Sequence, residues 1–353
     1  MIELETIWQD YGLDKLEQGL SKLFPKYELS LGTLLEEIMT GDIFGAVSYF
    51  FEGILSGVTG SFTGMKNILV WMVILGIVSA LMTHFIEIFD KHQIADLGFY
   101  FIYLLLSAVL LQAFMGVLQT ASDTITNIVT FVKLLIPTFL LSVGLATGSV
   151  TGGASYQLLL FLIYGVESVL VGVVLPMVYA MCMLAVLNGI WPEEKLVLIV
   201  GLLEKGIGWI LKAALGVVTG FSIVQAMVTP AVDAVKSSVF RKAVSAIPGV
   251  GNAADGVMEL LLGSAVVIKN SIGIALLILL IVLCAAPLLQ MFATALLLKV
   301  AAAMMGLVSG KRITACADRV GDACMLLFRT SGMAVLLFLI SLSVVAMSTN
   351  RGI

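Results

Sequence analysis

Charged side chains are scarce in this sequence, and their scarcity excludes most soluble proteins. Lysine and arginine supply 19 of the 353 residues, and aspartate and glutamate supply 23. The charged fraction is thus 12%, whereas soluble domains contain about 25%. Hydrophobic residues make up 60% of the chain. A soluble chain of this length needs a broad polar exterior. We therefore expect an integral membrane protein whose apolar surface contacts membrane lipid.

Residues that commonly carry catalysis or bind metals are also few. The four cysteines form no Cys-x-x-Cys pair, so neither disulfides nor zinc are expected, and two histidines fit no catalytic motif. Residues 306–312, GLVSGKR, superficially resemble a P-loop, but one residue is missing between the glycines and Arg312 replaces the magnesium-binding hydroxyl residue. The net charge of −4, with no basic face, argues against nucleic acid. No enzyme, cofactor, metal site or nucleic-acid partner is expected.

Long apolar runs dominate the chain after an acidic, amphipathic segment over 1–64, which is expected to lie outside the membrane or at its surface and shows no signal peptide. A bilayer core of about 30 Å is crossed by about 20 helical residues. Transmembrane helices are therefore expected over 65–228 and 271–353, in an all-α polytopic bundle of about six to eight spans. The candidate spans are 68–89, 97–118, 128–146, 157–187, 196–226 and 324–347, and 272–308 would cross once or twice around Pro287.

The distribution of basic residues predicts an orientation, because lysine and arginine gather in cytoplasmic loops. With eight spans and the N-terminus outside, most basic loop residues fall inside, Lys311 and Arg312 among them. Lys195 then lies in an outside loop. An N-terminus outside the cell membrane is the favoured interpretation.

Residues 229–270 differ from a plain membrane span. Thr229 and Pro230 are typical of a helix start, and an amphipathic helix follows as far as Ile247. Pro248, Gly249 and Gly251 then form a turn, after which a second helix carries Asp255. The pattern predicts an amphipathic or re-entrant helical hairpin, and these four residues of the turn and second helix are candidate functional residues.

This hairpin segment resembles the signature region of the stage III sporulation protein AE family. The resemblance lies in a helix, an Ile-Pro-x-x-Gly turn, an Asp-containing helix that ends in Leu-Gly, and a Lys-Asn pair. The matching residues are Ile247, Pro248, Gly251, Asp255, Leu262, Gly263, Lys269 and Asn270. It extends over most of the chain, but this central segment is its specific part.

The resemblance implies a multi-pass protein in the mother-cell membrane that surrounds the forespore. There the family looks like the membrane core of a secretion-like channel complex, needed for forespore development after engulfment. The implied partners are a cytoplasmic ATPase and ring-forming subunits, products of the stage III sporulation A operon, together with the forespore stage II sporulation protein Q.

Ionisable residues within the apolar runs are the remaining site candidates, because a charge at a helix centre costs about 2.5–3.5 kcal/mol on insertion scales. They are Glu167, His84, Glu87, Lys133 and Lys212. Most lie near the end of a span, where a long side chain reaches the membrane surface. Glu167 lies deeper and is expected to face protein or a polar path.

Glycines four residues apart predict close packing between helices. They are Gly144, Gly148 and Gly152 in one run and Gly216 and Gly220 in another.

Two other functions remain open. A stand-alone secondary transporter would explain buried charges and interrupted helices, although no internal repeat is evident. A purely structural membrane scaffold fits the sequence equally well.

Overall fold

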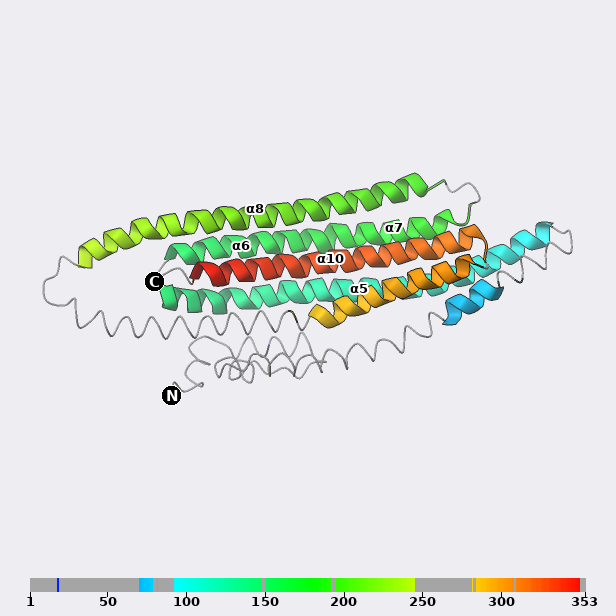
Figure 1. Cartoon of the computed structure of the whole chain (residues 1–353), viewed down its shortest axis with the longest axis horizontal. Helices are drawn as coiled ribbons and strands as arrows, with labels where there is room; N and C mark the ends of the chain where they lie inside the picture. The colour runs from blue at the N-terminus through cyan, green and yellow to red at the C-terminus, as the bar shows by residue number, and fades with distance from the viewer. Residues whose placement is uncertain are drawn as a thin grey trace.

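The structure is a computed structural model that describes residues 70–78, 92–147, 150–191, 195–244, 284–307 and 309–349, with the single positions 18, 81 and 281. Within these residues every regular element is a helix. The helices are residues 70–78, α5 (His92–Thr147), α6 (Val150–Val169), the π-turn η1 (Leu170–Val174), α7 (Leu175–Asn188), α8 (Val197–Val244), Cys284–Gly306 and α10 (Lys311–Thr349). They lie alongside one another in a long bundle (Figure 1).

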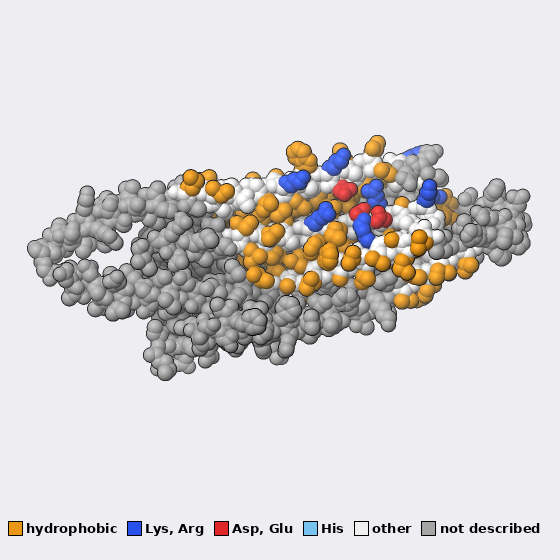
Figure 2. All heavy atoms as spheres, in the orientation of Figure 1, with side chains coloured by type: hydrophobic (Ala, Val, Ile, Leu, Met, Phe, Trp, Pro, Cys, Tyr) orange, Lys and Arg blue, Asp and Glu red, His pale blue; other side chains and the backbone are white. Residues whose placement is uncertain are grey.

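Five of the described helices are long and apolar enough to cross a membrane, which confirms the predicted all-α polytopic fold. The apolar stretches are Gly98–Phe131, Phe161–Asn188, Val197–Val224, Cys284–Gly306 and Lys311–Ile340. Many large hydrophobic side chains point outward, among them Phe101, Leu104, Phe161 and Trp209. Figure 2 shows this apolar surface, with the charged side chains gathered in one part of the visible face.

Helix α5 replaces two of the predicted spans with one continuous helix. The sequence predicted separate spans at 97–118 and 128–146, because the residues between them are polar. In the structure those polar groups bond within the helix: Thr120 Oγ1 donates to the carbonyl of Gly116 at 2.9 Å, and Thr124 Oγ1 donates to that of Thr120 at 2.7 Å. The helix therefore continues through the polar stretch, and its 56 residues span about 84 Å at 1.5 Å per residue.

A π-turn interrupts the next pass of the chain through the bundle. The N–H of Leu175 bonds to the carbonyl of Leu170, five residues back, instead of four. Pro176 follows at the start of α7 and has no N–H to donate to the preceding turn. This missing donor gives a local reason for the irregular turn between α6 and α7.

Helix α8 extends beyond the predicted boundary at residue 228. Thr229 and Pro230 were expected to begin a new helix, but they lie inside α8, which continues to Val244. A proline removes one backbone hydrogen bond from a helix interior, yet neighbouring groups in membrane-spanning bundles can satisfy the released carbonyl. The start predicted for the hairpin is thus wrong, and its turn and second helix lie outside the described residues.

Helix α10 is the centre of the bundle, since it contacts α5, α6, α7 and α8. Its apolar stretch is also the most buried of the five. The largest side chains of the core come from α5 and α10, including Phe114, Phe131 and Phe338, and the last two rings meet edge to face at 5.9 Å between centroids. Helix α10 therefore fills the space between the helices that precede it.

Two turns lie together at one end of the bundle. One joins α7 to α8 and contains Lys195, and the other joins Cys284–Gly306 to α10, which begins with Lys311 and Arg312 (Figure 1). Arg312 donates hydrogen bonds to carbonyl oxygens of the first turn. The predicted orientation, which placed Lys195 on the opposite side of the membrane from Lys311, is therefore wrong in this respect. Its error follows from counting 272–308 as two crossings in the eight-span arrangement, because only the crossings between Lys195 and Lys311 decide whether the two residues share a side.

Candidate functional site

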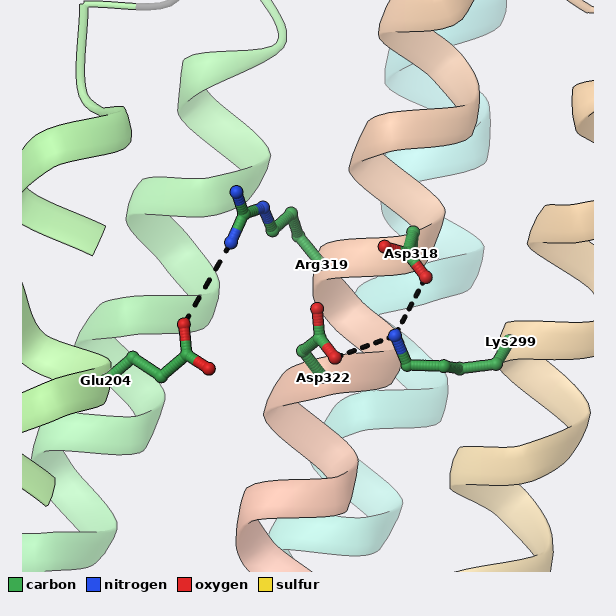
Figure 3. Close-up of polar contacts among 5 residues, drawn as sticks. All are labelled: Glu204, Lys299, Asp318, Arg319 and Asp322. Atoms are coloured by element: carbon green, nitrogen blue, oxygen red, sulfur yellow. Dashed lines mark hydrogen bonds and ion pairs between the residues drawn. The ribbon is translucent and has the colours of Figure 1, made fainter. Parts of the chain in front are cut away.

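A network of ion pairs joins three helices in the charged part of the bundle (Figure 3). Lys299 Nζ lies 2.8 Å from Asp318 Oδ1 and 2.7 Å from Asp322 Oδ1, so one ammonium group holds two carboxylates of α10. Arg319, between these aspartates in sequence, reaches toward Glu204 of α8 at 4.0 Å. The network thus links α8 and the helix Cys284–Gly306 through α10.

Helical spacing positions this network. Asp318 and Asp322 are four residues apart and therefore share one face of α10, where a single lysine can reach both. Gly321 lets the neighbouring helix approach closely: a Cβ at this glycine would lie 2.9 Å from Lys299 Cγ and 3.8 Å from the carbonyl oxygen of Ala295. Close packing here brings the lysine stem across α10.

Each side chain of the network is between about a third and a half exposed. Solvent or headgroups therefore screen these pairs where they are exposed, and each contributes at most about 1 kcal/mol. Pairing nevertheless reduces the cost of placing five charges on helices that cross a membrane. The network can fix how three helices pack, and none of its groups is arranged as a nucleophile with a base.

Arg312 holds the two turns together at their shared end of the bundle. Its Nε and one terminal nitrogen donate to the carbonyl of Gly189 at 3.2 and 2.9 Å, and the terminal nitrogen also donates to the carbonyl of Ile190. The guanidinium stacks on Phe99, 4.3 Å from the ring centroid. The segment that resembles a P-loop is thus a turn between two helices, and its arginine satisfies carbonyls left open at the end of α7.

Tyr103 reinforces this end from α5. Its hydroxyl donates to the carbonyl of Val186, and its ring stacks on Phe99 with centroids 5.7 Å apart. A Cβ at Gly189 would overlap the tyrosine ring, with Cζ at 2.8 Å. Only glycine leaves room for this contact between the start of α5 and the end of α7.

Glu167 is the other polar feature of the bundle interior. Its side chain is 0% exposed, and neither carboxyl oxygen has a hydrogen-bond partner among the described residues. It lies in the last turn of α6, three residues before the π-turn. The prediction that Glu167 faces protein rather than lipid agrees with this burial, while a polar path beside it stays a prediction.

The other predicted residues do not gather around Glu167. Lys133 is exposed and its ammonium lies over the Tyr164 ring, 4.8 Å from the centroid, and Lys212 is exposed on α8. A Cβ at Gly216 or Gly220 would meet no heavy atom of the described residues within 4 Å, so the described part of the chain shows no close packing there. Gly144 and Gly152 lie in α5 and α6, near the junction of the two helices.

Several predicted residues lie outside the described part of the chain. They are His84, Glu87, Gly148, Pro248, Gly249, Gly251 and Asp255, together with nearly all of the segment 1–64. Their roles stay predictions. Within the described residues, no three histidine, cysteine, aspartate or glutamate side chains are placed to hold a metal ion.

Sequence reasoning missed the aspartates of the ion-pair network and the role of Arg312. One signal was available for the first: two aspartates four residues apart share one face of a membrane-spanning helix, which predicts a cation on a neighbouring helix. No comparable signal marks Arg312, because its partners are backbone carbonyls more than 120 residues away in sequence.

Comparison with known proteins identifies the family. The sequence profile of the stage III sporulation protein AE family matches residues 29–349. The chain belongs to this family. The stage III sporulation protein AE of Bacillus subtilis strain 168 is 20% identical over 344 residues, which cover 96% of this chain and 86% of that protein. No solved structure matches the chain. The resemblance inferred from residues 247–270 is confirmed, and with it a place among the stage III sporulation proteins.

Proposed function

We propose that this chain is a membrane-embedded subunit of a secretion-like channel complex that links the mother cell and the forespore. Family membership over residues 29–349 is the observation that carries the proposal. The five long apolar helices support it, because a chain embedded in the bilayer crosses it as helices whose backbone groups bond internally. On this proposal the chain resides in the mother-cell membrane around the forespore and supports forespore development after engulfment.

The proposed partners are the other proteins of the stage III sporulation A operon, namely a cytoplasmic ATPase and ring-forming subunits, and the forespore stage II sporulation protein Q. A subunit that works by assembly needs no catalytic residues of its own. The ion pairs among Glu204, Arg319, Asp322, Asp318 and Lys299 support a rigid, defined packing of helices on which partners can dock.

Deletion of the gene in its spore-forming host tests this proposal. We expect engulfment to finish and forespore development then to stop, and a plasmid copy of the chain to restore spores. Affinity purification of the restored chain from sporulating cells in mild detergent should recover the ATPase and ring-forming subunits. Normal spore yield in the deletion strain would refute the proposal.

Two alternatives make different predictions. A stand-alone secondary transporter is favoured by the buried Glu167 beside an interrupted helix, a feature that transporters use near substrate sites. It requires solute flux in liposomes that contain this chain alone.

A scaffold without a conducting role predicts that Glu167→Gln assembles and sporulates normally. Glu204→Gln, at a half-exposed carboxylate, is the matched control.

A further inference from the structure

The buried carboxyl group of Glu167 calls for a physical explanation. A buried polar group without a hydrogen bond is destabilising, and a charged one inside a membrane is more so. Leucine or methionine at this position would avoid that cost. A carboxyl group retained there therefore points to a use of its acid chemistry.

The surroundings of Glu167 are mostly apolar. Ile163 and Leu170, on either side of it in the chain, are fully buried. Met333 of α10 packs against the same small cluster as Ile163 and Val166, so this part of α10 lies level with the end of α6. Ser331, two residues earlier on α10, is also fully buried, and its hydroxyl oxygen has no partner among the described residues.

Charged groups on the helices around α6 point elsewhere. Lys133 of α5 lies over the Tyr164 ring, and Lys212 of α8 and Arg329 of α10 are exposed. Cys284, on the helix Cys284–Gly306, is the titratable group close enough to interact electrostatically with Glu167. Among the described residues, therefore, no cation neutralises this carboxylate.

A metal ion does not fit this place. Hard cations such as calcium and magnesium take about six or more oxygen ligands, and the described residues provide no cluster of three histidine, cysteine, aspartate or glutamate side chains. A proton needs a single carboxyl oxygen. Of the small cations, the proton is the one that this apolar environment accommodates.

The π-turn provides a point near Glu167 at which the helices can separate. Residues Leu170–Val174 form a wider turn one helical turn after Glu167, and Pro176 removes a further backbone donor. A Cβ at Gly172, within the turn, would meet no heavy atom of the described residues within 4 Å. The turn departs from regular α-helical hydrogen bonding, and such turns recur at functional sites.

We propose that Glu167 is a proton-binding site inside the membrane-spanning bundle: its carboxyl group holds a proton while the helices are packed and releases it when they part at the π-turn. On release the O–H bond breaks, the electron pair stays on the carboxylate and the proton passes to a water molecule. The inference concerns the chain alone and holds whether or not the channel-complex proposal is correct.

A hydrophobic carbodiimide tests the site in the purified full-length protein, because this reagent reacts with protonated carboxyl groups in apolar surroundings. Mass spectrometry of the modified protein should locate the adduct at Glu167 at neutral pH. Above the midpoint the modified fraction should fall about tenfold per pH unit, as expected for loss of one proton. Glu204, half-exposed and paired with Arg319, is the internal control and should stay unmodified at neutral pH.

Three results would overturn the inference: no adduct at Glu167 at any pH in folded protein, an adduct that does not depend on pH, or protection of Glu167 by sodium at constant pH. Glu167→Gln preserves size and should abolish the adduct without loss of monodisperse protein. In sporulating cells Glu167→Asp should retain more activity than Glu167→Gln, because only the former can exchange a proton. Failure of the channel-complex proposal would instead appear as normal spores in the deletion strain.

Discussion

Single residues decide how closely the helices of this bundle approach. Gly189 lies against the Tyr103 ring, and Gly321 lies against the stem of Lys299. Neither contact was evident from sequence, because a glycine needed for space looks the same as one that faces an open surface. The glycines chosen by their spacing, Gly216 and Gly220, show this limit, since both face open space among the described residues. Spacing identifies a helix face but not the helix that covers it.

Replacing Gly189 with alanine should destabilise the protein by about 1–3 kcal/mol, the usual cost of overpacking, because the new methyl group overlaps the Tyr103 ring. Thermal unfolding in detergent measures the effect. Gly208→Ala on α8 is the control, because its Cβ meets nothing within 4 Å among the described residues and alanine favours the helix. Equal melting temperatures for the two variants would contradict the predicted contact.

Lys299→Met should lower stability by about 1 kcal/mol or less, since the pairs are partly exposed and screened. The loss arises because Asp318 and Asp322 repel each other once the ammonium is gone. The triple variant Lys299→Met, Asp318→Asn, Asp322→Asn should recover most of it. Unfolding midpoints of the unsubstituted chain, Lys299→Met, the double variant Asp318→Asn, Asp322→Asn and the triple variant give the coupling. If the triple variant is less stable than Lys299→Met alone, the aspartates have another role.

At the scale of helices, the sequence predicted the right class of element and several wrong boundaries. Apolar runs identify membrane helices reliably, because lipid leaves the backbone no other partner. Hydropathy fails where polar side chains bond to their own helix, as Thr120 and Thr124 do in α5. It fails again at Pro230, inside α8. The burial of Glu167 followed from its apolar flanks, whereas the π-turn depends on hydrogen-bond geometry that no residue pattern shows.

Deletion of Gly172 should yield a folded protein, because a π-turn holds one residue more than an α-helical turn and the deletion leaves a regular helix. The buried faces of α6 and α7 then keep their positions. Deletion of Ala180 within α7 is the control, as it rotates buried Leu175 and Val178 relative to Met181 and Cys182. The yield of monodisperse protein and its melting temperature distinguish the two. Aggregation of both deletion variants alike would argue against a dispensable residue in the π-turn.

For the whole molecule, the shared end of the bundle predicts the topology. Lys195 and Lys311 are exposed near the two turns that Arg312 joins, so both must lie on one side of the membrane. The concentration of basic residues there predicts the cytoplasmic side of the membrane. Only the three-dimensional structure reveals this arrangement, because the count of crossings along the sequence placed the two lysines on opposite sides of the membrane.

Cysteines placed at Lys195 and Lys311 should react with an impermeant maleimide from the same side of the membrane. The native cysteines Cys182, Cys284, Cys316 and Cys324 are all buried and should give little background. Inside-out and right-side-out vesicles provide the two sides, and the unsubstituted chain is the control. Labelling of the two positions from opposite sides would refute the packing of the two turns.

The central place of α10 has a consequence for biosynthesis. This helix contacts α5, α6, α7 and α8, yet the ribosome makes it after all four. These four helices must wait in the bilayer with the faces that contact α10 uncovered until residues 311–349 emerge. A chain that stops before residue 311 should therefore be degraded by quality-control proteases, and a separately expressed segment 311–349 should rescue it in trans.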